Sequence, residues 1–112
     1  MRRPIMKDSR SKYHNQKVTI HGETFDSKHE AARWQDLQIL QRAGVIEQLK
    51  RQVRFEILPK IGKFRAKYYI ADFTYLSNGK LVVEDAKGVK TPVYQLKKHL
   101  MMLVHKIEIK EV

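Results

Sequence analysis

Residues 67–88 read KYYIADFTYLSNGKLVVEDAKG, and this stretch decides the fold. Two runs rich in aromatic and β-branched residues lie on either side of Ser77-Asn78-Gly79. An Asn-Gly pair between two such runs is a strong hairpin signal, because both residues tolerate a positive φ. The stretch therefore predicts a β-hairpin whose first strand contains Asp72 and whose second strand ends in Asp85 and Lys87.

Upstream of the hairpin, the sequence predicts a strand, a helix and a short strand or hairpin. The run IEQLKRQVRFEIL, residues 46–58, alternates over several positions and is expected to be a strand. Ser27 followed by Glu30 fits a capping box, and Gly44 is a natural stop, so a helix is expected from Ser27 to Ala43. Its apolar positions recur at helical spacing: Ala31, Trp34, Leu37 and Leu40. Residues 17–25, KVTIHGETF, are expected to form a short strand or hairpin.

Downstream, Thr91-Pro92 is expected to open a second helix, with Thr91 as the cap. The apolar side of this helix is supplied by Val93, Leu96, Leu100, Leu103 and Val104. Residues 106–112, KIEIKEV, alternate and are expected to form a final strand. The predicted order is helix, three strands, helix, strand, in an α/β fold. Residues 18–112 are expected to be one domain, preceded by a flexible basic arm at residues 1–17.

The charge of the chain indicates its partner. Of the 112 residues, 23 are Lys or Arg and 12 are Asp or Glu, a formal net charge of +11. Such an excess predicts a polyanionic partner, and nucleic acid is favoured because the cations are spread along the chain. The alternative is a generically basic domain, such as a ribosome-associated protein. No apolar run approaches the roughly 18 residues that span a membrane, and the absence of cysteine is typical of a reducing cytoplasm.

The charged end of the second hairpin strand predicts a site. Side chains alternate along a strand, so Asp85 and Lys87 share one face and Glu84 points to the other, outside the site. Direct pairing through Asn78-Gly79 places positions whose numbers sum to 157 opposite each other, which sets Asp72 against Asp85. Facing carboxylates destabilise a sheet, and a divalent cation would offset this repulsion.

An acid on one hairpin strand and D-x-K at the end of the next resembles the PD-(D/E)XK nuclease superfamily. The matching residues are Asp72, Asp85 and Lys87, although Ala71-Asp72 stands where Pro-Asp is frequent. The element order is similar to that superfamily's restriction-endonuclease-like α-β-β-β-α-β core, a central mixed sheet flanked by helices. The run FDSKHEAARW resembles the first-helix motif of phage junction-resolving endonucleases and would place Glu30 in the site; the alternative is that Glu30 only completes the capping box. More narrowly, FDSKHEA, ADFTY, VVEDAKG and IEIKEV resemble small phage-encoded nuclease-like proteins.

The resemblance implies a set of roles. Mg²⁺, for which Mn²⁺ would substitute, would be held by Glu30, Asp72, Asp85 and the Ala86 carbonyl. Lys87 would orient the attacking water or stabilise the transition state. The residues expected to contact DNA are Arg2, Arg3, Arg54, Lys63, Arg65, Lys90, Lys97 and Lys98.

The expected function is therefore a Mg²⁺-dependent DNA endonuclease selective for branched or Holliday-junction DNA. Two symmetric cuts in a four-way junction would require a homodimer. If the protein is phage-encoded, it would act in the bacterial host cytoplasm. The alternatives are a nicking or packaging-associated nuclease that acts on duplex, and a non-catalytic basic DNA-binding module.

Overall fold

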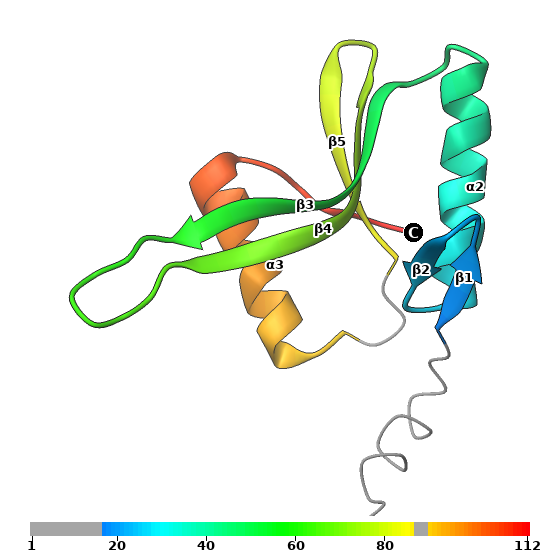
Figure 1. Ribbon diagram of the computed structural model, residues 1–112. Helices are drawn as coiled ribbons and strands as arrows, with labels where there is room; N and C mark the ends of the chain where they lie inside the picture. The colour runs from blue at the N-terminus through cyan, green and yellow to red at the C-terminus, as the bar shows by residue number, and fades with distance from the viewer. Residues whose placement is uncertain (1–16, 87–89) are drawn as a thin grey trace, which may run out of the picture.

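The structure is a computed structural model that describes residues 17–86 and 90–112. The predictions for Arg2, Arg3, Lys87 and the basic arm up to residue 16 lie outside the described residues. The elements, in chain order, are β1 (Val18–Ile20), β2 (Glu23–Phe25), α2 (Lys28–Arg42), β3 (Glu47–Leu58), β4 (Lys67–Ser77), β5 (Lys80–Asp85), α3 (Pro92–His105) and β6 (Lys110–Glu111) (Figure 1).

The main sheet has four strands in the order β3-β4-β5-β6. The first three strands are antiparallel and β6 runs parallel to β5, so the sheet is mixed. The strands β1 and β2 form a separate two-stranded hairpin. The predicted order of helix, three strands, helix and strand is confirmed, and the fold is α/β.

The β4–β5 hairpin has the predicted turn and register. Asn78 and Gly79 have φ values of 52° and 78°, as a type I′ turn requires. Phe73 pairs with Glu84 and Ser77 pairs with Lys80, so paired positions sum to 157. The turn therefore fixes which residues face each other at the far end of the hairpin.

Both helices begin where the sequence predicts. The Ser27 Oγ accepts a hydrogen bond from the Glu30 N–H at 3.1 Å, and the Thr91 Oγ1 accepts one from the Tyr94 N–H at 3.1 Å. These side chains satisfy N–H groups that have no partner within the first turn. The second helix ends at Lys106, which adopts a left-handed conformation with φ of 60°.

Two apolar clusters lie at different parts of the sheet, one under each helix. The cluster at α2 contains Leu37, Ile46, Phe73 and Tyr75, with Trp34 packed against it. The cluster at α3 contains Ile57, Tyr69, Ala71, Val83, Tyr94, Met101 and Ile109. Figure 1 shows α2 beside the β4–β5 turn and α3 behind the long β3–β4 ribbon.

The strand β4 changes its helix partner at Asp72. Ala71 packs in the α3 cluster and Phe73 in the α2 cluster, although residues two apart on a regular strand share a face. In β3, Gln52 lies between the partners of these two residues and has a positive φ of 53°. The ribbon therefore bends at this point, and Asp72 lies at the border between the two clusters.

Two sequence expectations need correction. Four of the apolar α3 residues face solvent, with exposed fractions of 48–62%: Val93, Leu96, Leu103 and Val104. The side of α3 that packs contains Tyr94, Leu100 and Met101. The closing strand is also shorter than expected, because Lys106 caps α3 and only Lys110 and Glu111 pair with β5.

Candidate active site

Asp72 and Asp85 both lie at the end of the β4–β5 hairpin that is far from its turn. Phe73 and Glu84 are the last pair of the β4–β5 register, and Asp72 and Asp85 are the next residues of the two strands. The Asp72 Oδ2 accepts a hydrogen bond from the Ala86 N–H at 2.8 Å, across the two strands. Asp85 is 1% exposed, and Asp72 is half-buried. The hairpin thus fixes two carboxylates beside the residue that leaves β5.

Two tyrosines lie close to this carboxylate pair. The Tyr69 hydroxyl donates to the Asp85 Oδ2 at 2.6 Å. Burial raises the pKa of Tyr69, and the hydrogen bond to Asp85 and the negative charges of Asp85 and Asp72 raise it further. Burial also raises the pKa of Tyr94, whose hydroxyl donates to Glu111 and which senses the charges of both aspartates. Both tyrosines are therefore neutral hydrogen-bond donors at physiological pH.

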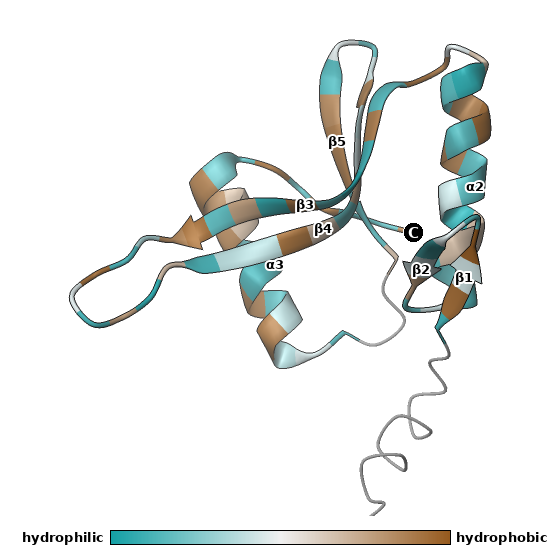
Figure 2. Ribbon diagram, viewed as in Figure 1, coloured by the Kyte–Doolittle hydropathy of each residue, from teal (hydrophilic) through white to brown (hydrophobic). Residues whose placement is uncertain are grey.

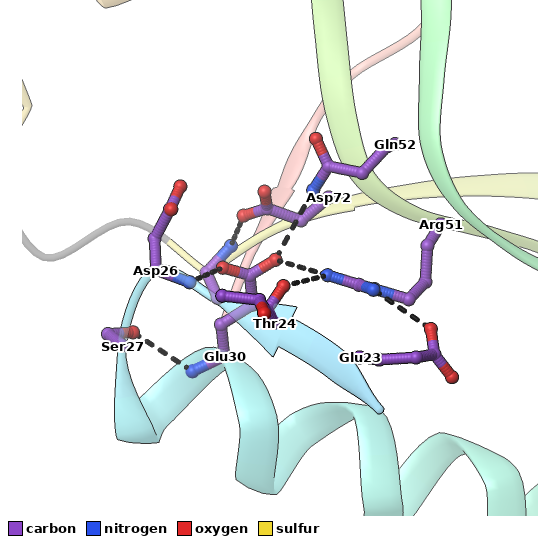
Figure 3. A network of polar contacts seen from close by, with 9 residues as sticks. Glu23, Thr24, Asp26, Ser27, Glu30, Arg51, Gln52 and Asp72 are labelled. Atoms are coloured by element: carbon purple, nitrogen blue, oxygen red, sulfur yellow. Dashed lines mark hydrogen bonds and ion pairs between the residues drawn. The ribbon is translucent and has the colours of Figure 1, made fainter. Parts of the chain in front are cut away.

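Glu30 lies in a network of polar contacts between α2, β2 and β3, which Figure 3 shows together with Asp72. Its side chain is buried, and its Oε1 accepts from the Asp26 N–H at 3.2 Å. Its Oε2 accepts from the Gln52 Nε2 at 3.4 Å and lies 3.7 Å from the Arg51 Nη2. Burial raises the pKa of Glu30, while the hydrogen bond from Asp26 and the charge of Arg51 partly oppose this.

The Glu30 carboxylate bonds a different N–H from the one that the predicted capping box requires. Ser27 caps α2 as the capping box predicts, but the Glu30 carboxylate bonds the Asp26 N–H. Glu30 therefore stabilises the start of α2 through Asp26, the residue before the Ser27 cap. Glu30 and Leu37 are both buried, as expected for the helix side that faces the sheet. Its contact with Gln52 brings it to the bend in the ribbon, where Asp72 also lies.

The predicted metal ligands are brought together only in part. Within residues 17–86 and 90–112, no group of three His, Asp or Glu side chains could hold a metal ion. Asp72 and Asp85 lie at the same end of the β4–β5 hairpin, and Asp72 accepts from the Ala86 N–H, whereas the Glu30 carboxylate contacts Gln52 and Arg51. Paired carboxylates are the hard oxygen ligands that Mg²⁺ prefers, so the residues present fit this ion.

Two of the predicted DNA contacts lie beside Asp85. Lys90 Nζ and Lys98 Nζ each lie 3.2 Å from a carboxylate oxygen of Glu111. Glu111 pairs with Asp85 between β6 and β5, so the two lysines flank the end of β5. The hydrogen bond from Tyr94, assisted by the lysines, lowers the pKa of Glu111 to about 2.

The other predicted DNA contacts among the described residues lie on α3 and on the β3–β4 ribbon. Lys97 is half-buried on α3. The Arg54 guanidinium stacks on the Tyr68 ring at 4.1 Å from its centroid, part of the way along the β3–β4 ribbon. Lys63 and Arg65 are exposed residues between β3 and β4, at the far end of that ribbon. The predicted DNA contacts in the described part of the chain thus fall into more than one group.

Sequence reasoning placed Glu84 outside the site and missed its structural role. Glu84 is fully buried, and Arg33 Nε and Nη2 donate to its two oxygens at 2.8 and 2.7 Å. The Tyr75 hydroxyl donates to it as well. Burial alone raises the pKa of Glu84, but the hydrogen bonds and the charge of Arg33 outweigh burial and lower it. The one sequence signal for this buried ion pair was strand alternation, which turns the Glu84 side chain away from that of Asp85.

Arg51 is a second residue that the sequence did not single out. Its guanidinium lies 3.9 Å from the Phe25 ring centroid and donates to Glu23 at 2.9 Å and to the Thr24 carbonyl at 3.1 Å. These contacts join the β1–β2 hairpin to β3 beside Glu30 (Figure 3).

The fold and this geometry define an α/β protein with two carboxylates at the open end of a β-hairpin. Residues 10–111 match the profile of a family described as "Protein of unknown function (DUF1064)", and the chain belongs to that family. No curated protein and no solved structure matches the chain. Within the described residues, no helix has the length and apolar character needed to cross a membrane.

Proposed function

We propose that this protein is a Mg²⁺-dependent DNA endonuclease with a restriction-endonuclease-like core, acting as a homodimer on branched DNA such as Holliday junctions. The observation that carries this proposal is the end of the β4–β5 hairpin: Asp72 and Asp85 follow the last pair, Phe73 and Glu84, and the Asp72 carboxylate accepts the Ala86 N–H at 2.8 Å. A bare pair of facing carboxylates is unfavourable in a sheet. A site that binds a divalent cation gives a reason for this arrangement.

Three groups of residues would have distinct roles in the site: metal ligands, hydrogen-bond donors that orient them, and a catalytic lysine. Asp72 and Asp85 would hold the ion, with the Ala86 carbonyl beside them, and the hydrogen bonds from Ala86 and Tyr69 keep the two carboxylates oriented. Bound Mg²⁺ supplies a water of lowered pKa and stabilises negative charge on the scissile phosphate. Lys87 remains the predicted catalytic lysine.

Glu30 is the third proposed ligand. The contacts of its Oε2 with Gln52, at 3.4 Å, and with Arg51, at 3.7 Å, are long, so this oxygen would turn toward the ion at little cost while Oε1 keeps its bond from the Asp26 N–H. The raised pKa of Glu30 shows that its neighbours compensate its charge incompletely. A nearby cation would stabilise the charged form.

The electrostatics of the surface favour DNA as the substrate. The net charge is +11, and Lys90 and Lys98 contact Glu111, which pairs with Asp85 between β6 and β5. Lysines that neutralise phosphates release condensed counterions, which drives binding to DNA without regard to sequence. This placement would bring a phosphate to the carboxylate pair.

A second function, that of a non-catalytic DNA-binding module, is favoured by one observation. Within the two described ranges, no three acidic or histidine side chains are grouped to hold a metal. Such a module would use the same basic surface and would bind DNA without cutting it.

The test is cleavage of a labelled panel: linear duplex, single strand, nicked duplex, flap and four-way junction, each with Mg²⁺, Mn²⁺ or EDTA. We expect metal-dependent cutting, fastest on the junction, that falls by at least about 100-fold in Asp72→Asn and in Asp85→Asn. The matched control is Asp36→Asn, an exposed acid on α2, which should cut as the wild type does. Preference for linear or nicked duplex would favour the duplex-nuclease alternative. Tight binding with no cutting in either metal would establish the binding module instead.

A further inference from the structure

The β3–β4 ribbon continues beyond the helix that covers it. Ile57 and Tyr69 are its last residues buried against α3. From Leu58 to Lys67, every residue except Ala66 is exposed. Figure 1 shows this segment, which we call the arm, projecting away from α3 and from the rest of the sheet. Phe64 is seven positions from Ala71, so the tip of the arm lies roughly 20 Å from the bend.

The tip of the arm holds two apolar side chains in a defined turn. Ile61 and Phe64 exchange backbone hydrogen bonds of 3.1 and 2.8 Å. Gly62, the first of the two residues between them, has φ of 56°, as a type II′ turn requires. Residues paired in this way project to the same side of a ribbon. Their exposed fractions are 65% for Ile61 and 69% for Phe64, and Phe64 is the most exposed of the large hydrophobic residues in the described part of the chain.

The charge around the tip identifies a polyanionic partner. Residues 57–71 contain four cations and no acid: Lys60, Lys63, Arg65 and Lys67. Figure 2 shows hydrophobic and hydrophilic residues alternating around the tip. A purely apolar contact with another protein would not require this excess of positive charge next to it. Apolar side chains ringed by cations match DNA, where bases lie between two lines of phosphates.

We propose that the arm enters DNA at a branch point, where Ile61 and Phe64 contact the faces of unstacked bases and Lys60, Lys63 and Arg65 contact the flanking phosphates. This inference rests on the proposed function, because it takes DNA as the partner. It adds that the recognised feature of the DNA is the branch point. Proteins that insert apolar side chains into a regular duplex must separate stacked bases. At a branch point part of that stacking is already lost, so insertion there is easier than in linear duplex. The arm thereby selects branched DNA without reading its sequence.

The experiment uses a four-way junction with 2-aminopurine at the branch point, and a linear duplex with the same probe, both in EDTA so that nothing is cut. We expect wild-type protein to change the fluorescence at the branch point and to bind the junction more tightly than the duplex. The double variant Ile61→Ser/Phe64→Ser should lose the fluorescence change and reduce the junction preference by about 10-fold. Its thermal stability should be unchanged, because both side chains are exposed.

The matched control is Ile39→Ser/Val45→Ser, which removes two hydrophobic side chains with exposed fractions of 56% and 57%, one in the last turns of α2 and one just after the helix. It should keep both the fluorescence change and the junction preference. A third variant, Lys60→Gln/Lys63→Gln/Arg65→Gln, should lower the slope of log affinity against log salt by about 2 to 3.

The inference is overturned if the tip variant matches the wild type in fluorescence and junction preference. It is also overturned if the tip variant instead changes the oligomeric state in sedimentation without DNA, because the tip would then contact a second copy of the chain. The two proposals can fail separately. A fluorescence response from a protein that cuts no substrate supports the arm and refutes only the nuclease, and cutting that persists with no response refutes only the arm.

Discussion

Replacing Arg33 with methionine tests how β5 is held next to α2. Arg33 donates two hydrogen bonds, of 2.8 and 2.7 Å, to the fully buried carboxylate of Glu84. After the replacement, Glu84 keeps its bond from Tyr75, and the Lys110 Nζ lies 3.9 Å away. Removing one partner of a buried ion pair costs about 3–5 kcal/mol, because a charge remains without compensation. The Arg33 side chain is 23% exposed, so water can partly replace it, and we expect a loss of about 3 kcal/mol at pH 7.

The loss should depend on pH with a definite sign. In the wild type, the pKa of Glu84 is lowered, so the pair stabilises the fold above the unfolded pKa of about 4.3. That stabilisation is lost as the pH falls toward the lowered folded value. In Arg33→Met, burial dominates and raises the pKa of Glu84. The variant therefore regains stability on acidification, and its difference from the wild type shrinks between pH 7 and pH 4.5.

The assay is urea unfolding followed by the fluorescence of Trp34, which stacks on Phe73 in the α2 cluster with 5.8 Å between ring centroids. Arg42→Met, which removes an exposed cation from the last turn of α2, is the control and should change stability little. The double variant Arg33→Met/Glu84→Gln has no charge at the buried position 84 and should recover at least half of the loss. An equal loss at pH 7 and pH 4.5, or a double variant as unstable as Arg33→Met, would refute the reasoning.

Two further carboxylates give predictions of opposite sign. Burial raises the pKa of Glu30, so its negative charge opposes folding at neutral pH. Glu30→Gln should therefore be at least as stable as the wild type at pH 7. Below about pH 4, where Glu30 is protonated in both the folded and the unfolded state, the variant should have no higher stability than the wild type. The same variant should lower Mg²⁺-dependent cleavage, and lower stability at pH 7 would contradict the assignment. The pKa of Glu111 is lowered to about 2 by Tyr94, Lys90 and Lys98, so it stabilises the fold above about pH 4.3, and this contribution fades as the pH falls to 2. Glu111→Gln should flatten the stability profile in that window, measured by urea unfolding, and an unchanged slope would count against the Glu111 contacts.

The features that the sequence predicted well depend on local chemistry. Ser27 and Thr91 begin the helices because their hydroxyls accept N–H groups of the first turn. Asn78 and Gly79 accept positive φ, and a two-residue turn leaves one register for the hairpin. That register brings Asp72 and Asp85 to the same end of the hairpin, directly after the pair of Phe73 and Glu84. These features need no knowledge of what lies on either side of the sheet.

The tertiary structure alone decided the long-range features. The apolar residues Val93, Leu96 and Leu103 have a spacing that suits a buried or an exposed side, and packing of Tyr94 and Met101 against the sheet turned them to solvent. Arg33 and Glu84 are 51 positions apart, and only the approach of α2 to β5 joins them. The distance from Glu30, on α2, to Asp72 and Asp85 is likewise set by how closely α2 packs on the sheet. Alternation and capping specify the direction of a side chain within its own element, whereas the meeting of two elements is set by how their buried surfaces fit together.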